Sequence, residues 1–161
     1  MENKGKLLAA GVLPICLATE RMLLSRRREQ VDFGGTWASW GGKFESEKGD
    51  KTIEDCARRE FKEETLIHDD YHFVAEPVHV YEDHRVVYYT FIGFFDSEVE
   101  PNVVDGGELA GYEWVSLDDI PQSLMPEFDI MLQAELPRIK DMIAQMKGNG
   151  KGDRFKFDEF R

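Results

Sequence analysis

The sequence has few cysteines, fewer basic than acidic residues, and no long apolar run. Its two cysteines, Cys16 and Cys56, are too few for a disulfide framework and indicate buried thiols in a reducing compartment, so we expect a cytoplasmic protein. No apolar stretch reaches the length that a bilayer requires, and the N-terminus lacks the layout of a signal peptide. These absences argue against a disulfide-rich secreted protein, and no membrane partner is expected.

The shortage of positive charge limits the partners that the protein can bind. The chain has 20 Lys and Arg against 32 Asp and Glu, a formal net charge of −12. Such a charge opposes binding to the phosphates of long nucleic acids, so we expect none as a partner. A small anionic substrate is still compatible with it, because a metal ion held by acidic side chains can supply positive charge. Most of the acidic residues need only keep the protein soluble.

What the sequence does contain is a globular composition, with 42% hydrophobic and 12% aromatic residues in a chain of 161. We expect one domain over residues 1–147, followed by a charged tail at 148–161. Strands are predicted at 7–18, 22–26, 71–81, 85–95 and 112–115, and helices at 52–65 and 127–146, the second kinked or split at Pro137. Thr52 and Asp55 have the spacing of a capping box at the start of the first helix. This order predicts an α/β (α+β) fold with a mixed sheet between two helices.

The helix predicted at 52–65 carries three acids beside an apolar stripe. Glu60, Glu63 and Glu64 lie three and four positions apart, so their carboxylates project to one side of the helix. Crowded next to apolar residues, they repel one another and lose hydration, which is costly unless a cation neutralises them. Such oxygen ligands suit Mg²⁺ or Mn²⁺ rather than zinc. The alternative is an ordinary charged helix face. The stripe is formed by Ile53, Ala57 and Phe61.

Two glycines and a lysine precede this helix. Gly41-Gly42 permits close backbone approach and positive φ, so a main-chain carbonyl could join a metal shell. Lys43 follows directly and could contact a phosphate. The alternative is a plain tight turn.

Together these segments resemble the Nudix box, a glycine followed by a glutamate and then by Arg-Glu-hydrophobic-x-Glu-Glu-x-Gly. Gly42 opens the pattern and Arg59-Glu60-Phe61-Lys62-Glu63-Glu64-Thr65 reproduces its most diagnostic part. Residues 41–45 resemble the usual approach to the box, and residues 111–118 resemble the strand that follows it. The resemblance covers about residues 7–132, and it implies the Nudix fold and a hydrolase of the MutT type.

The sequence departs from the family pattern in two places. The stretch from Gly42 to Arg59 is about three residues longer than the pattern, so the first glutamate of the box falls on Lys51, and Asp50 or Glu47 would have to replace it. The glycine that follows the Glu-Glu pair is Leu66 here. Leucine adopts the left-handed conformation at a cost of about 1 kcal/mol or more, so the helix either ends there at that cost or continues to residue 68 or 69.

The resemblance implies a metal site and the residues that serve it. Arg59 would orient the glutamates through a salt bridge, and Glu60 and Glu63 would have catalytic roles. Glu108, in a glycine-containing loop, is the candidate for the additional acid that acts as ligand or base, with Glu113 as the second choice. The alternative for Glu108 is a solvated loop acid. The implied metal ligands are Gly41 (through its carbonyl), Glu60, Glu63, Glu64 and Glu108.

The implied reaction is metal-dependent attack of water on a diphosphate. Mg²⁺ or Mn²⁺ is the expected cofactor, and a (d)NTP or oxidised (d)NTP is the expected substrate. ADP-ribose, dinucleoside polyphosphates and capped RNA stay open. Arg26, Arg27 and Lys43 are candidate phosphate contacts, and Trp37 is a candidate for stacking on a base, with Trp40 and Tyr81 beside it. The alternative for these aromatic residues is the core.

Two other functional classes share the fold. A Nudix-fold module could sense a nucleotide without cleaving it, although non-catalytic members usually lose box acids that are present here. An isomerase of isoprenyl diphosphates would need an added catalytic cysteine in the pocket, and Cys56 lies near the carboxylates rather than opposite them. A homodimer is compatible with the sequence.

Overall fold

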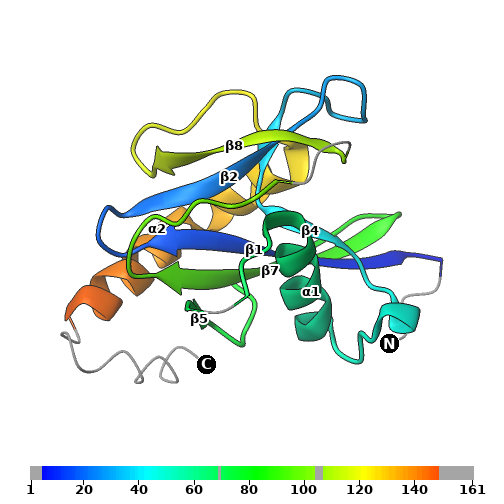
Figure 1. Ribbon diagram of the computed structural model, residues 1–161, viewed down its shortest axis with the longest axis horizontal. Helices are drawn as coiled ribbons and strands as arrows, with labels where there is room; N and C mark the ends of the chain where they lie inside the picture. The colour runs from blue at the N-terminus through cyan, green and yellow to red at the C-terminus, as the bar shows by residue number, and fades with distance from the viewer. Residues whose placement is uncertain (1–4, 69, 104–106, 149–161) are drawn as a thin grey trace.

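The computed structural model describes residues 5–68, 70–103 and 107–148, and it contains a mixed sheet of eight strands with two long helices (Figure 1). The predicted C-terminal tail lies outside the described residues, apart from Gly148. The elements are β1 Leu7–Cys16, β2 Arg21–Arg27, β3 Trp37–Ala38, β4 Trp40–Lys43, the short 3-10 helix η1 Ser46–Lys48, α1 Ile53–Thr65, β5 His72–Phe73, β6 His79–Glu82, β7 Val86–Phe95, β8 Leu109–Ser116 and α2 Pro126–Gly148. The predicted fold class is confirmed.

Strand β1 is the centre of the sheet. It pairs antiparallel with β2 and β4 and parallel with β7 over ten residue pairs. β7 also pairs with β5 and β6, while β2 pairs with β3 and β8. None of the described helices is long and apolar enough to cross a membrane. The predicted strand at 71–81 is in fact two short strands, β5 and β6, because the residues between them include Pro77.

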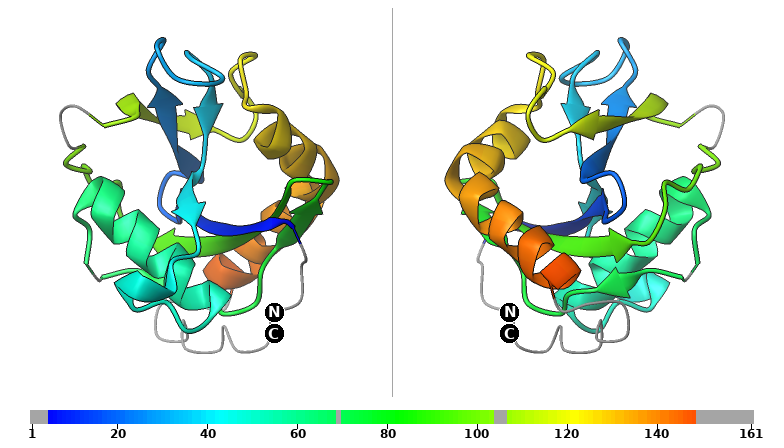
Figure 2. Two further views of the ribbon diagram at one scale, coloured as in Figure 1. Left: turned by 90° about the vertical axis from the view of Figure 1, so that its right-hand side faces the viewer. Right: turned by 90° about the vertical axis from the view of Figure 1, so that its left-hand side faces the viewer.

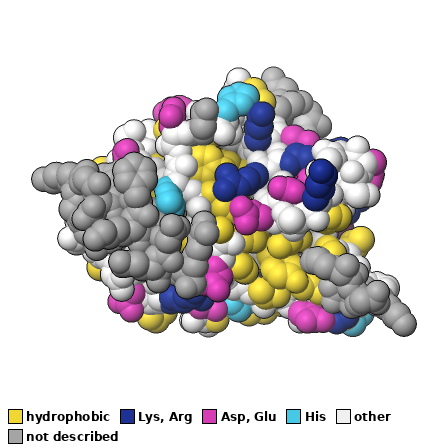
Figure 3. Space-filling model, turned by 90° about the horizontal axis from the view of Figure 1, so that it is seen from below, with side chains coloured by type: hydrophobic (Ala, Val, Ile, Leu, Met, Phe, Trp, Pro, Cys, Tyr) yellow, Lys and Arg dark blue, Asp and Glu magenta, His cyan; other side chains and the backbone are white. Residues whose placement is uncertain are grey.

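The alternation of side chains along β1 builds a core on each face of the sheet. Leu13 and Ile15 point into a cluster that contains the apolar residues of α2. Ala10 and Val12 point to the opposite face, into a cluster that contains Phe61 of α1. The two helices therefore cover opposite faces, as Figure 2 shows. On the face seen from below, basic and acidic side chains are interspersed beside an apolar area (Figure 3).

Both ends of helix α1 are closed by hydrogen bonds between residues that are close in the sequence. The Thr52 hydroxyl accepts a hydrogen bond from the Asp55 amide, and the Asp55 carboxylate accepts one from the Thr52 amide, so the predicted capping box is present. Leu66 follows the helix in the left-handed conformation, with φ 59°, and its amide donates to the Lys62 carbonyl. Of the two predicted endings, continuation to residue 68 was wrong. A leucine takes the place of the usual glycine.

Two other predictions need correction. Pro137 does not split α2, which is continuous over 23 residues. Buried residues lie on both sides of the proline, such as Met131 before it and Ile139 after it, and their packing offsets the lost backbone hydrogen bond. The strand predicted at 112–115 is longer than expected, because β8 begins at Leu109 and its Gly111 pairs with Arg26. Of the glycine-containing loop predicted around Glu108, Gly106 lies outside the described residues.

Candidate active site

The Arg59 side chain is held in place by Asp50, which precedes α1 in the sequence. Its Nε donates to Asp50 Oδ1 at 2.8 Å and its Nη2 donates to Asp50 Oδ2 at 2.7 Å. The Asp50 side chain is only 2% exposed, and its Oδ2 also accepts from the Glu45 amide at 2.9 Å. These hydrogen bonds hold the pKa of Asp50 below its usual value. Of the two candidate replacements for the first glutamate of the box, Asp50 forms a buried salt bridge with Arg59, whereas Glu47 is exposed on η1.

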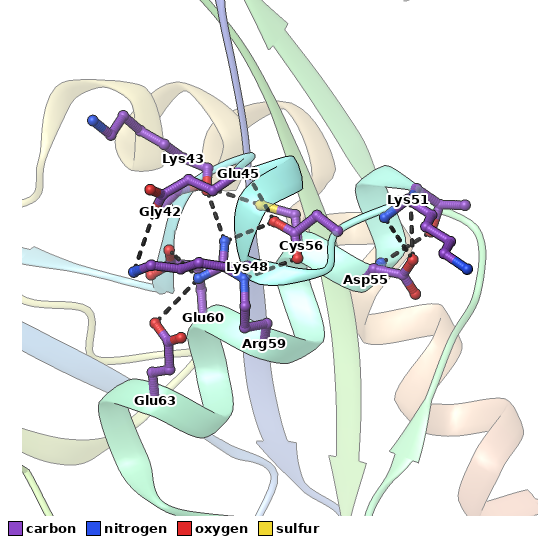
Figure 4. A network of polar contacts seen from close by, with 12 residues as sticks. Gly42, Lys43, Glu45, Lys48, Lys51, Asp55, Cys56, Arg59, Glu60 and Glu63 are labelled. Atoms are coloured by element: carbon purple, nitrogen blue, oxygen red, sulfur yellow. Dashed lines mark hydrogen bonds and ion pairs between the residues drawn. The ribbon is translucent and has the colours of Figure 1, made fainter.

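The other side of the Arg59 guanidinium faces the acids of α1 (Figure 4). Its Nη1 donates to Glu60 Oε2 and to Glu63 Oε1, each at 3.1 Å. Its Nη2 also donates to the Lys43 carbonyl at 2.9 Å, which ties the end of β4 to the helix. The predicted contact between Arg59 and Glu63 is present. The Arg59 guanidinium thus orients Glu60 and Glu63 together with the end of β4.

Gly42 is required by the position of Glu60. A Cβ at Gly42 would overlap the Glu60 carboxylate, with Cδ only 2.5 Å away. Gly41 is packed equally tightly, because its Cβ would overlap the Tyr88 hydroxyl and the Ala10 carbonyl. The close approach predicted for the two glycines is therefore present. The positive φ predicted with it is not, since the described glycines with positive φ are Gly5, Gly35 and Gly49.

Glu64 is the most unusual group in the site. Its Oε1 is buried, with no hydrogen-bond partner among the described residues. Burial raises the pKa of Glu64 well above its usual value, and the nearby Glu60 adds to this effect, while a hydrogen bond from the Gly41 amide opposes it. Burial also raises the pKa of Glu60, against the Arg59 guanidinium. An orphaned buried carboxylate oxygen costs roughly 1–3 kcal/mol or more in a protein without a ligand.

Glu63 and Glu108 face an open hollow of about 270 Å³ on the outer side of Glu64. Glu108 lies 3.8 Å from the Arg27 guanidinium and is 70% exposed, and Glu63 is 46% exposed. In the described part of the chain, no three Asp, Glu, His or Cys side chains converge with the geometry of a metal centre as they stand. Both outer acids are instead paired with arginines. Because they are exposed, they can rotate toward Glu64 at little cost.

On its inner side Glu64 lines a partly enclosed cavity of about 80 Å³. The cavity lies between the sheet and the start of α2. Arg27 and Tyr81, two of the residues predicted to lie near the substrate, line this cavity. The sequence did not single out Tyr88, whose buried hydroxyl hydrogen-bonds with the Ser39 side chain, or Glu127, in the first turn of α2. The period-two pattern of β7 could have placed Tyr88 on one face but not beside Gly41.

The other predicted substrate residues lie away from this cavity. Arg26 is exposed, 6.0 Å from the centre of the Trp37 ring and 3.4 Å from Glu29. Trp37 packs at the edge of the core under α2. The Lys43 ammonium is exposed and points away from Glu60 and Glu63 (Figure 4). Trp40 is fully buried and donates its Nε1 hydrogen to the Leu23 carbonyl, so it is a core residue.

Cys56 does not provide a reactive thiol. It is buried in α1, its Sγ lies 3.5 Å from the Gly42 carbonyl, and burial raises its pKa to about 12. It is therefore protonated at neutral pH. Both cysteines are free and buried, as the sequence predicted.

A mixed sheet between two helices, with Arg59 bound to the acids of α1, is the arrangement that the resemblance to the Nudix box implies. The comparisons with known proteins agree. The family model of the NUDIX domain matches residues 5–134, so this chain belongs to the Nudix hydrolase family, whose members are pyrophosphohydrolases. No curated protein sequence matches it.

Solved structures share the fold. A MutT Nudix hydrolase from Burkholderia pseudomallei has a TM-score of 0.59 and 23% identity, and the match covers 80% of this chain and 96% of that one. A MutT protein from Methanosarcina mazei Go1 has a TM-score of 0.61 and 22% identity, with 86% and 98% covered. A bifunctional NMN adenylyltransferase/ADP ribose pyrophosphatase from Francisella tularensis, complexed with AMP and a Mn ion, has a TM-score of 0.62 and 19% identity, with 86% and 43% covered.

Proposed function

We propose that this protein hydrolyses the diphosphate of a nucleoside diphosphate-linked substrate, most readily a (d)NTP or oxidised (d)NTP, with Mg²⁺ or Mn²⁺ as cofactor. The observation that carries the proposal is the buried Oε1 of Glu64, which has no partner among the described residues and lies between the outer hollow and the inner cavity. A cation is the group that such an oxygen lacks.

The donor set fits a hard divalent cation. Glu60, Glu63, Glu64 and Glu108 supply only carboxylate oxygens, and the Gly41 carbonyl could add another; neither sulfur nor imidazole belongs to the set. When bound, the metal would neutralise the diphosphate and lower the pKa of the attacking water. The protein itself would hold the acids in place through Arg59.

The remaining side chains would bind and orient the substrate. Arg27 lines the cavity and is only 19% exposed, so its charge is weakly screened and can hold a phosphate. Its present partner Glu108 would be free to turn toward the metal once phosphate replaced it. Glu108, or another of these acids, could then accept the proton of the attacking water. We further propose a cytoplasmic location, in line with two reduced, buried cysteines.

The experiment is a substrate panel with Mg²⁺ or Mn²⁺, following release of phosphate, pyrophosphate and nucleoside monophosphate. ADP-ribose and dinucleoside polyphosphates belong in the panel. We expect Glu64→Gln to reduce kcat by roughly 100-fold or more. Glu54→Gln, which removes an acid on the same helix that pairs with Arg58, is the matched control and should be fully active. Equal activity of the two variants would refute the metal assignment, and tight binding without cleavage would favour a sensor.

A further inference from the structure

Two glycines face each other across the strand pair at the centre of the sheet. Gly11 of β1 lies opposite Gly41 of β4 in the antiparallel register. A glycine inside a buried strand weakens that strand, and it often marks a place where another group approaches the backbone closely. The group here is the Tyr88 hydroxyl, which would overlap a Cβ at either glycine. The two glycines therefore form a slot for the end of one tyrosine side chain.

Tyr88 reaches this slot from the other side of β1. It belongs to β7, where it lies beside Ala9 in the parallel register, so its side chain must cross β1 over Gly11 to approach β4. Its hydroxyl hydrogen-bonds with the side chain of Ser39, directly before β4. Burial holds the pKa of Tyr88 well above its usual value, so the hydroxyl is protonated at neutral pH. Tyr88 thus links β7 to the segment that leads into β4.

The main chain of Gly41 faces the acids rather than β1. The Phe44 amide donates to the Leu8 carbonyl, and in an antiparallel ladder only every second pair from there is hydrogen-bonded. The pair of Gly11 and Gly41 is one that is not. The amide and the carbonyl of Gly41 therefore point away from β1. The amide donates to Glu64, and the carbonyl lies on the same side of the strand.

Gly41 and Gly42 are packed from opposite faces of the sheet. Tyr88 lies against Gly41 in the cavity between the sheet and α2, whereas Glu60 of α1 lies against Gly42. Glycine has the widest choice of backbone conformations, so contacts with neighbouring groups must fix the orientation of these peptides. Loss of the Tyr88 hydroxyl would leave the Gly41 peptide free to shift, and its amide and carbonyl would move relative to Glu64.

We propose that the Tyr88 hydroxyl is a positioning group for the metal site, which keeps the amide and the carbonyl of Gly41 on the side where Glu64 lies. This inference rests on the proposed function, because it takes the cation to bind at Glu64. Tyr88 supplies no ligand of its own, since its hydroxyl is engaged by Ser39 and acts through the main chain of β4. Phenylalanine at this position would fill the place of the ring but leave the slot between the glycines empty.

The test is Tyr88→Phe, which removes only the oxygen atom from the slot. We expect the Kd for Mn²⁺, measured by electron paramagnetic resonance without substrate, to rise by roughly 10-fold, as when a group that supports a metal ligand is lost. In the substrate panel, the Mn²⁺ concentration for half-maximal activity should rise by a similar factor, whereas kcat at saturating Mn²⁺ should stay within about 3-fold. Tyr89→Phe, the same change at the next residue of β7 on the opposite face of the sheet, is the matched control and should alter neither value.

Ser39→Ala tests the same link from its other end. It should also weaken Mn²⁺ binding, and adding it to Tyr88→Phe should have little further effect, because both changes remove one contact. Lower thermal stability of Tyr88→Phe with an unchanged Kd would mean that Tyr88 only packs, and the positioning role would be wrong while the hydrolase function stands. If no diphosphate is cleaved but Tyr88→Phe still weakens Mn²⁺ binding, the proposed function fails and the role of Tyr88 survives. A wild type that binds no Mn²⁺ would overturn both.

Discussion

The contact between Asp50 and Arg59 gives the sharpest test of how this site is held. Asp50→Asn keeps the shape of the side chain and one acceptor oxygen, but it removes the charge and places an NH₂ group against the guanidinium. The wild-type carboxylate accepts two bonds from Arg59 and one from the Glu45 amide, in a place where it is 2% exposed. Charge-assisted hydrogen bonds contribute about 1.5–3 kcal/mol each, and breaking a buried pair costs about 3–5 kcal/mol.

The expected loss of unfolding free energy is below that upper range, because Arg59 keeps Glu60, Glu63 and the Lys43 carbonyl as partners. We expect about 2–3 kcal/mol, which for a domain of this size corresponds to a fall in Tm of roughly 5–10 °C. Since Arg59 also orients Glu60 and Glu63, the variant should bind Mn²⁺ about 10- to 100-fold more weakly. Urea denaturation followed by circular dichroism, and metal titration, measure the two effects.

The pH dependence of this loss has a definite sign. The folded-state pKa of Asp50 is lowered from its usual 3.8, so the carboxylate binds its proton less readily in the folded protein. Its contribution to stability is therefore fully present above pH about 4 and is lost as pH falls through the folded-state pKa. The difference between wild type and Asp50→Asn should close at that point. Glu47→Gln, an exposed change in the same loop, should leave stability and activity unaltered; an equal effect of both substitutions would refute the assignment.

Three further predictions follow from single contacts. Glu64→Gln should raise the unfolding free energy of the metal-free protein by about 1–2 kcal/mol while activity is lost, because a neutral amide relieves a buried charge; urea denaturation and the substrate panel measure this. Gly42→Ala should leave Tm within a few degrees but lower activity about 10-fold or more, since the added Cβ moves the Glu60 carboxylate. Leu66→Gly should stabilise the protein by about 1 kcal/mol in the same denaturation assay, because it relieves a left-handed leucine that is 47% exposed.

The parts of the site that lie on one helix could be predicted from the sequence. Spacing of three and four residues places Glu60, Glu63 and Glu64 on one side, and the cap at Thr52 fixes where the helix begins. The choice between Asp50 and Glu47 could not be made in advance. It depends on how the longer loop folds through η1, and local sequence does not determine which of two acids a loop directs inward.

The cavity could not be predicted for a different reason: the residues that line it are far apart in the sequence. Tyr88 reaches Gly41 only because β7 and β4 both pair with β1, and Glu127 reaches the same space from α2 on the opposite face. The direction of Lys43 was also unpredictable, because its backbone carbonyl, rather than its ammonium group, is what the site uses. Pairings between distant segments decide such details, and a single sequence shows them only as separate strands.

The charges of the acids in the site are only partly balanced by Arg59. Asp50 accepts two short hydrogen bonds from the Arg59 guanidinium. The Nη1 of Arg59 donates to both Glu60 and Glu63 at 3.1 Å. Among the described residues, Glu64 makes no ion pair with that arginine and accepts a hydrogen bond from the Gly41 amide. The arginine thus organises the acids without neutralising them. On the proposed function, a bound cation would recover the stability lost at the buried Oε1 of Glu64, next to the place where the diphosphate would be held.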